Sequence, residues 1–122
     1  PIFFTGCAQK SLDGTVISKD GMGVTIEKRF DHRIDTAKLK GTIVKAAKNI
    51  GWMTTPLGER KIIAEKYFSE NKNIAAEITL AAEGYTIEFS SGQNVEDEAA
   101  DLLETLENAI EEELEKENGS DD

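Results

Sequence analysis

The sequence is poor in the residues that build disulfides and metal sites, because its 122 residues include one cysteine (Cys7) and one histidine (His32). One cysteine cannot form an internal disulfide, so a disulfide scaffold is excluded. A zinc site normally takes several Cys or His ligands, so we expect no metal and no cofactor. No stretch approaches the roughly 20 apolar residues that a membrane-spanning helix needs. The composition therefore predicts one globular domain with a modest core.

The negative charge is concentrated at the C-terminal end of the chain. Residues 1–94 carry 13 Lys/Arg and 11 Asp/Glu, a net charge of +2, whereas residues 95–122 carry one Lys and 13 Asp/Glu, a net charge of −12. Acidic charge repels nucleic-acid phosphates, and the remainder is too nearly neutral to bind them strongly. We therefore expect no nucleic-acid binding.

A β-hairpin is predicted over residues 15–30. Asp20-Gly21 is a turn pair that readily takes positive φ, and apolar residues precede it. After the turn the side chains alternate. One face holds Val24, Ile26, Lys28 and Phe30.

A helix is predicted from about residue 36 to residue 50, with Asp35 as its N-cap and Gly51 as its stop. Its apolar residues follow helical spacing. They are Leu39, Ile43, Ala46, Ala47 and Ile50. The opposite face is basic and carries Lys38, Lys45 and Lys48.

Further strands follow this helix. A turn at residues 56–58 separates Trp52-Met53 from Ile62-Ile63. Residues 73–80 and 85–90 alternate cleanly between apolar and polar side chains, which is typical of an antiparallel sheet with one buried face. The predicted fold class is therefore α+β, an antiparallel sheet of about five strands packed against two amphipathic helices.

The second of those helices is predicted to open at Asn94 and to follow an apolar stripe. Glu113 and Glu117 fall inside the same arc as that stripe. A carboxylate should not be forced into a core, so we predict that packing ends near Ile110 to Leu114. The expected organisation is an N-terminal segment over residues 1–10, one α+β domain over residues 11–114, and a disordered acidic tail over residues 115–122.

Cys7 ends the stretch "FTGC", which resembles the lipobox of bacterial lipoproteins. In that motif a bulky apolar residue and two small residues precede a cysteine whose thiol receives a diacylglyceryl group. Each buried acyl methylene contributes about 0.8 kcal/mol, so two or more chains hold a protein durably on a membrane. The alternative is that Cys7 is a small buried residue at a strand end. The lipobox interpretation requires a basic and apolar leader upstream of Pro1.

From Ala46 to Glu113 the chain is similar to a group of small, uncharacterised bacterial lipoproteins. The shared pattern is Gly51-Trp52, then "IIAEKYF", "NIAAEITLAAEGYTIEF" and "SGQNV". The final helix departs from that group, which often carries His, Tyr-Asn and Trp where this chain has "ADLLETLENAIEEEL". The resemblance implies an envelope location and transfers no catalytic residue.

Trp52 and His32 are each the only residue of their type. Trp52 suits either a binding platform or a core anchor, and its position directly after Gly51 favours the core. His32 lies among Asp31, Arg33 and Asp35. A catalytic Ser-His-Asp set would also need an activated serine, and no nucleophile-elbow motif is present. We therefore interpret His32 as a solvated loop residue.

Pro1 offers an enzymatic alternative, because "PIFF" resembles the opening of the tautomerase superfamily. In that family the amine of an N-terminal proline acts as general base. The pattern downstream does not match the strand-helix-strand unit of the family.

The leading prediction is a small bacterial cell-envelope lipoprotein, anchored through Cys7, that acts as a non-catalytic binding or structural module. Ala8 follows the cysteine, and the absence of Asp there resembles lipoproteins of the outer membrane that face the periplasm. The main alternative is a soluble intracellular interaction domain whose acidic C-terminal helix docks on a basic protein partner.

Overall fold

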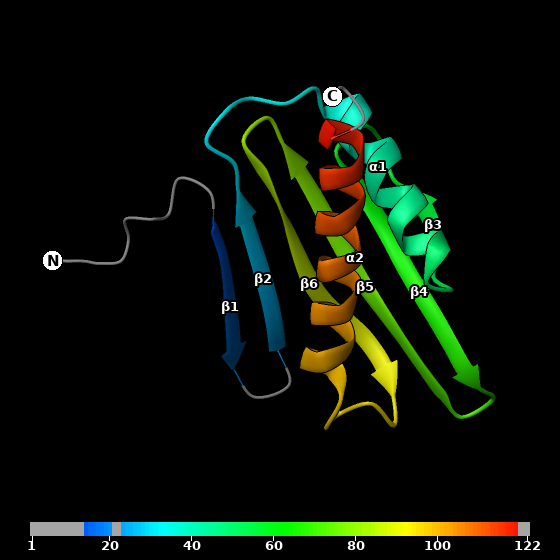
Figure 1. Cartoon of the computed structure of the whole chain (residues 1–122). Helices are drawn as coiled ribbons and strands as arrows, with labels where there is room; N and C mark the ends of the chain where they lie inside the picture. Colours follow the sequence, from blue (N-terminus) through cyan, green and yellow to red (C-terminus); the bar gives the residue numbers. More distant parts are fainter. Residues whose placement is uncertain (1–13, 21–22, 120–122) are drawn as a thin grey trace, which may run out of the picture.

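Two helices cover one face of a six-stranded antiparallel sheet in the computed structural model, which describes residues 14–20 and 23–119 (Figure 1). In chain order the elements are β1 (Gly14–Asp20), β2 (Gly23–Arg29), α1 (Thr36–Asn49), β3 (Met53–Pro56), β4 (Lys61–Ser69), β5 (Lys72–Ala81), β6 (Gly84–Gln93) and α2 (Ala99–Gly119). The predicted α+β class is confirmed. The sheet has six strands where about five were predicted, and Met53–Pro56 pairs with β4 as a short edge strand.

The strands lie in the order β1-β2-β6-β5-β4-β3. The predicted N-terminal hairpin is confirmed, since β1 pairs with β2 over the whole of both strands. β3 to β6 form a meander, and β6 returns to pair with β2. The N-terminal hairpin and the meander therefore meet along the β2–β6 ladder, in the middle of the sheet.

Alternation along the strands separates a core face from a wet face, as the sequence predicts. The inward side chains of the central strands are buried: Val24, Ile26, Ile62, Ala64, Ile74, Ala76, Ile78, Leu80, Tyr85 and Ile87. On the outward face of the β2–β6 ladder, Thr25 lies opposite Glu88 and Glu27 opposite Thr86. A sheet with one buried face needs a cover on that side only, and the two helices supply it.

α1 begins and ends where the sequence predicts. Asp35 caps it by accepting a hydrogen bond of 3.0 Å from the amide of Ala37. Gly51 follows the helix with a φ of 89°, a conformation that favours glycine. Trp52 is 3% exposed, so the core-anchor interpretation of the only tryptophan is confirmed.

α2 begins later than predicted. Asn94 does not cap it, because this residue adopts a φ of 59° and its side-chain amide donates to the backbone oxygen of Asn71. A turn follows in which the amide of Glu98 donates to the oxygen of Val95 at 2.9 Å. The helix then starts at Ala99. Asn94 therefore fixes the chain as it leaves β6 and does not start the helix.

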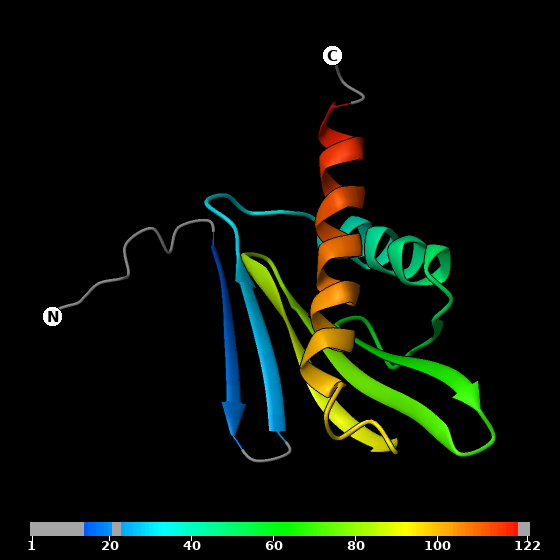
Figure 2. The same cartoon turned by 60° about the horizontal axis from the view of Figure 1, so that its bottom comes forward.

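The prediction that packing ends near Leu114, with a disordered tail from residue 115, is wrong for residues 115–119, because α2 continues to Gly119. Figure 2 shows the helix extending past the sheet, with α1 crossing it. Glu113 is 3% exposed, and its carboxylate lies 3.2 Å from Nζ of Lys45 on α1. The hydroxyl of Thr42 donates to Glu117 at 2.7 Å. The two carboxylates are tolerated because α1 supplies a cation and a hydroxyl to them.

Cys7 and Pro1, with the predicted N-terminal segment over residues 1–10, lie outside the described residues. The final residues 120–122 do as well.

Candidate ligand-binding site

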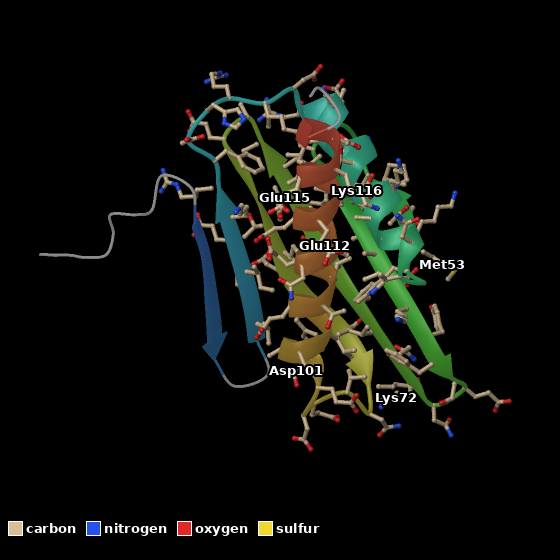
Figure 3. The ribbon with its side chains drawn as sticks, in the orientation of Figure 1. Met53, Lys72, Asp101, Glu112, Glu115 and Lys116 are labelled. Atoms are coloured by element: carbon tan, nitrogen blue, oxygen red, sulfur yellow. The ribbon has the colours of Figure 1, made fainter. Side chains whose placement is uncertain are left out.

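A cavity of about 160 Å³ opens between the segment that follows β2 and the C-terminal half of α2. The β2 side contributes Lys28, Phe30, His32 and Ile34. The helix side contributes Glu111, Leu114 and Glu115. Figure 3 shows Glu115 projecting from α2 toward β2, whereas Lys116 projects toward α1.

Local structure explains why these side chains converge. Lys28 and Phe30 continue the inward face of β2, because side chains two residues apart share a face of a strand. On α2, spacings of three and four residues place Glu111, Leu114 and Glu115 on one side of the helix. The two faces meet where α2 contacts β2, which lies beside this helix in Figure 1.

The loop wall of the pocket is tied to the turn between β5 and β6. The amide of Phe30 donates to the oxygen of Glu83 at 2.8 Å, and the amide of Ile34 donates to the oxygen of Ala82 at 2.8 Å. These two hydrogen bonds hold both ends of residues 30–34 against the sheet. The wall is thus formed before any ligand arrives, which lowers the entropic cost of binding.

Aromatic rings line this side of the pocket. The Phe30 ring centroid lies 6.0 Å from that of Tyr85 in an edge-on arrangement, with an interplanar angle of 61°. It lies 5.9 Å from the ring of His32, with an angle of 32°. Both spacings fall in the range of favourable ring contacts. Tyr85 is buried and is not part of the lining, so Phe30 and His32 are the rings of this wall and Tyr85 packs against Phe30 from the core.

A buried carboxyl lies next to the pocket. The hydroxyl of Tyr85 donates to Glu107 at 2.9 Å, and the Glu107 side chain is 3% exposed. Burial, together with a hydrogen bond to Glu111, raises the pKa of Glu107 to about 7, since two neighbouring carboxyls favour holding one proton between them. Burial likewise raises the pKa of Tyr85, so its hydroxyl stays protonated and donates.

Lys28 places a positive charge beside Glu107 and Glu111. Nζ of Lys28 lies 3.7 Å from the carboxylate of Glu111, and the Lys28 side chain is 13% exposed. The positive charge of Lys28 also lowers the pKa of Glu107, in opposition to burial. The pocket lining therefore combines the cation Lys28 with two carboxyl groups, Glu111 and Glu115. Behind it, Glu107 is hydrogen-bonded to Glu111 and has a pKa of about 7.

His32 lies at the rim of the pocket. Its side chain is 63% exposed and its Nδ1 lies 2.8 Å from Oδ1 of Asp31, so the interpretation as a solvated loop residue is confirmed. The hydrogen bond from His32 lowers the pKa of Asp31. The sequence interpretation missed that Lys28, Phe30 and Ile34 accompany this histidine in a pocket.

Glu107 was also missed, although the sequence carries a signal for it. It lies four residues after Leu103, three before Ile110 and seven before Leu114, so helical spacing places it on the core side of α2. A carboxyl at such a position needs a buried partner, and Tyr85 is that partner. The pairing joins residues 22 positions apart, which periodicity alone does not reveal.

The charged outer faces of the two helices are present as predicted. Lys38, Lys45 and Lys48 are exposed on α1, and Asp101, Glu112 and Glu115 are exposed on α2 (Figure 3). Four other acidic residues of α2 have partners within the fold, and they are Glu107, Glu111, Glu113 and Glu117. The acidity of this helix therefore serves internal packing as well as its surface.

Residues 14–20 and 23–119 contain neither a membrane-spanning helix nor a cluster of metal ligands. Neither helix there is long and apolar enough to cross a membrane. Among the same residues, no group of three or more His, Cys, Asp or Glu side chains is arranged to hold a metal ion.

Comparisons of the chain with protein-family models, with curated proteins and with solved structures found no match.

Proposed function

We propose that this chain is a non-catalytic ligand-binding module of the bacterial cell envelope, held on a membrane through a lipid on Cys7. The pocket between Phe30 and Glu115 is its binding site. The observation that carries the binding half of the proposal is the pre-formed pocket. Backbone hydrogen bonds fix its loop wall, and both walls bring apolar and charged side chains to the same cavity.

A binding role fits the chemistry of this pocket better than a catalytic role. The pocket lining contains no Ser, Thr or Cys that an adjacent base would activate. His32 turns its Nδ1 to Asp31 at the exposed rim, and the buried Glu107 is engaged by Tyr85. These groups shape and charge a site, and its lining offers no hydroxyl or thiol nucleophile.

The anchoring half of the proposal is supported by "FTGC" and by the position of this stretch ahead of the folded domain. Residues 8–13 separate Cys7 from the first described residue, Gly14.

The test of anchoring is the mass of the protein isolated from the membrane of cells that carry the natural gene. We expect Cys7 to bear a diacylglyceryl group and the protein to enter the detergent-rich phase. A Cys7→Ser variant should lose both properties and keep its fold. An unmodified Cys7 in the aqueous fraction of the natural strain would contradict anchoring and would leave the pocket untouched.

A second candidate function uses the outer face of α2 as a contact for a basic partner. Exposure of Asp101, Glu112 and Glu115 favours it. Deleting residues 111–122 would be a poor test, because the deletion also removes Glu113 and Leu114 from the packing with α1. The double variant Asp101→Lys with Glu112→Lys reverses exposed charge and leaves the core intact. It should abolish capture of a polylysine peptide if this face binds, and unchanged capture would eliminate the candidate.

A further inference from the structure

We infer that the pocket beside α2 takes a small organic cation, an ammonium group carried on an apolar body. The inference rests on the proposed binding function and specifies its ligand class. It depends on three properties of the pocket, namely the sign of its charge, its aromatic wall and its size.

The charge of the pocket favours a cation. Its helix wall presents Glu111 and Glu115, and the loop wall presents one permanent cation, Lys28, which lies 3.7 Å from Glu111. Glu115 therefore leaves the lining with a net negative charge. The whole chain has a net charge of −10, and the acidic helix that forms one wall carries much of it. Such a field raises the local concentration of cations and repels anions.

The aromatic wall suits a cation with a diffuse charge. Phe30 and His32 line the loop wall, and the helix wall carries the carboxylates. The buried ring of Tyr85 packs edge-on against Phe30. Electron-rich ring faces attract ammonium groups, most strongly when the site is partly shielded from water. A site with carboxylates on one side and rings on the other is therefore complementary to an alkylated ammonium group.

The apolar part of the pocket sets the size of the ligand. Ile34 and Leu114 are half-buried and contribute hydrocarbon from the loop wall and the helix wall respectively. The volume of about 160 Å³ is close to that of a cavity that holds one benzene ring. The ligand body is therefore of single-ring size.

The buried carboxyl adds a dependence on pH. Three ionisable groups face Glu107 from the elements packed around it, Lys28 on β2, Tyr85 on β6 and Glu111 on α2 itself. When Glu107 loses its proton near neutral pH, a further negative charge lies beneath the pocket. The affinity for a cation should accordingly rise between about pH 6 and pH 8.

Three probes of similar shape and different charge test the ligand class by calorimetric titration. They are benzyltrimethylammonium, benzyl alcohol and phenylacetate. We expect the cation to bind about tenfold more tightly than either of the others at low salt, and to lose that advantage as salt rises. Equal affinity for the three probes, or a preference for phenylacetate, would overturn the inference.

Two matched variants test whether the cation binds in the pocket. Glu115→Gln removes a carboxylate from the pocket, and Glu112→Gln removes one from the solvent side of the same helix. The first should weaken binding of the cation about three- to tenfold, and the second should change it less than twofold. Both positions are exposed, so both variants should fold. Equal effects of the two substitutions would show a general field effect of the helix and would contradict a pocket site.

The outcomes also separate the inference from the proposed function. If benzyl alcohol or phenylacetate binds best and Phe30→Leu blocks that binding, the pocket is a binding site and the inferred cationic ligand is wrong. Failure of all three probes to bind would discard the ligand class and the pocket together. The membrane anchor is tested independently, through Cys7. A thermal melt establishes that Phe30→Leu is folded before it is titrated.

Discussion

Tyr85 on β6 donates a hydrogen bond of 2.9 Å to Glu107 on α2, and both side chains are buried. The pair joins the middle of the sheet to the middle of the helix that covers it. It also places an ionisable group where its protonation state changes the stability of the fold. Glu107 is hydrogen-bonded to Glu111, and Glu111 lies next to Lys28 in the lining of the pocket. The same side chains therefore affect both the stability of the fold and the charge of the pocket.

Glu107 should make the protein less stable as pH rises toward neutrality. Its pKa is raised from 4.5 to about 7 in the folded chain, so between these values the folded state binds more protons than the unfolded state. The stabilisation from this group is therefore complete below about pH 4.5 and is lost as pH rises through 7. Glu107→Gln keeps a hydrogen-bond acceptor and removes the titration.

We expect Glu107→Gln to exceed the natural protein in free energy of unfolding at pH 8, by an amount of order 1–2 kcal/mol, and to equal it near pH 5. Urea denaturation at the two pH values measures the difference. Glu112→Gln makes the same substitution at an exposed position. Its free energy of unfolding should equal that of the natural protein at both pH values. A Glu107→Gln difference that did not vary with pH would contradict the assignment.

Tyr85→Phe tests the donor of the same hydrogen bond. Without the hydroxyl, Glu107 loses its partner from β6 and remains buried. We expect a loss of about 1–3 kcal/mol at pH 8, where the carboxyl is charged, and a smaller loss at pH 5.5. In the Glu107→Gln background the pH dependence of the Tyr85→Phe effect should disappear. Equal losses at both pH values would show that the hydroxyl does not support the carboxylate.

Lys45 should contribute more to stability than other lysines on α1. It lies 3.2 Å from the buried carboxylate of Glu113, and Lys45→Met would leave that carboxylate with Lys116, which is 4.0 Å away. The Lys45 side chain is largely exposed, so we expect a loss of about 1–2 kcal/mol, below the range for a fully buried pair. Lys48→Met, on the same helix, is the control and should change stability by less than about 0.5 kcal/mol. Chemical denaturation distinguishes the two.

Two glycines should respond to alanine in opposite directions. A Cβ on Gly84 would collide with the backbone oxygen of Lys28, because β6 begins closely packed against β2. Gly84→Ala should therefore cost about 3 kcal/mol or more, or prevent folding. A Cβ on Gly41 in α1 would meet nothing within 4 Å, so Gly41→Ala should raise stability by about 0.5–1 kcal/mol. Thermal melts of the two variants measure this contrast, and equal effects would contradict the packing of β6 against β2.

Local patterns predicted most of this fold. Asp35 and Gly51 bound α1, and the alternation from Ile74 to Leu80 identifies the buried face of β5. These features are short-range consequences of capping, backbone conformation and side-chain period, so one segment of sequence contains the whole signal.

The errors arose where one segment depends on another. The prediction that packing ends near Ile110 to Leu114 follows from Glu113 and Glu117, which fall in the apolar arc of α2. Their partners, Lys45 and Thr42 respectively, lie on a different helix. The pocket was missed for the same reason. Its two walls, around residues 28–34 and residues 111–115, are separated by most of the chain and meet only when the β2–β6 ladder forms.

The position of the ligand site is tested most directly by nuclear magnetic resonance of the ¹⁵N-labelled protein during titration with benzyltrimethylammonium at pH 7.5. Binding in the pocket should shift the amide signals of residues 28–34 and 111–115, and should leave those of the outward-facing residues Glu77, Thr79 and Glu88 unchanged. Shifts confined to the outward face of the sheet, or an absence of shifts around Phe30 and Glu115 at saturating probe, would contradict a binding site beside α2.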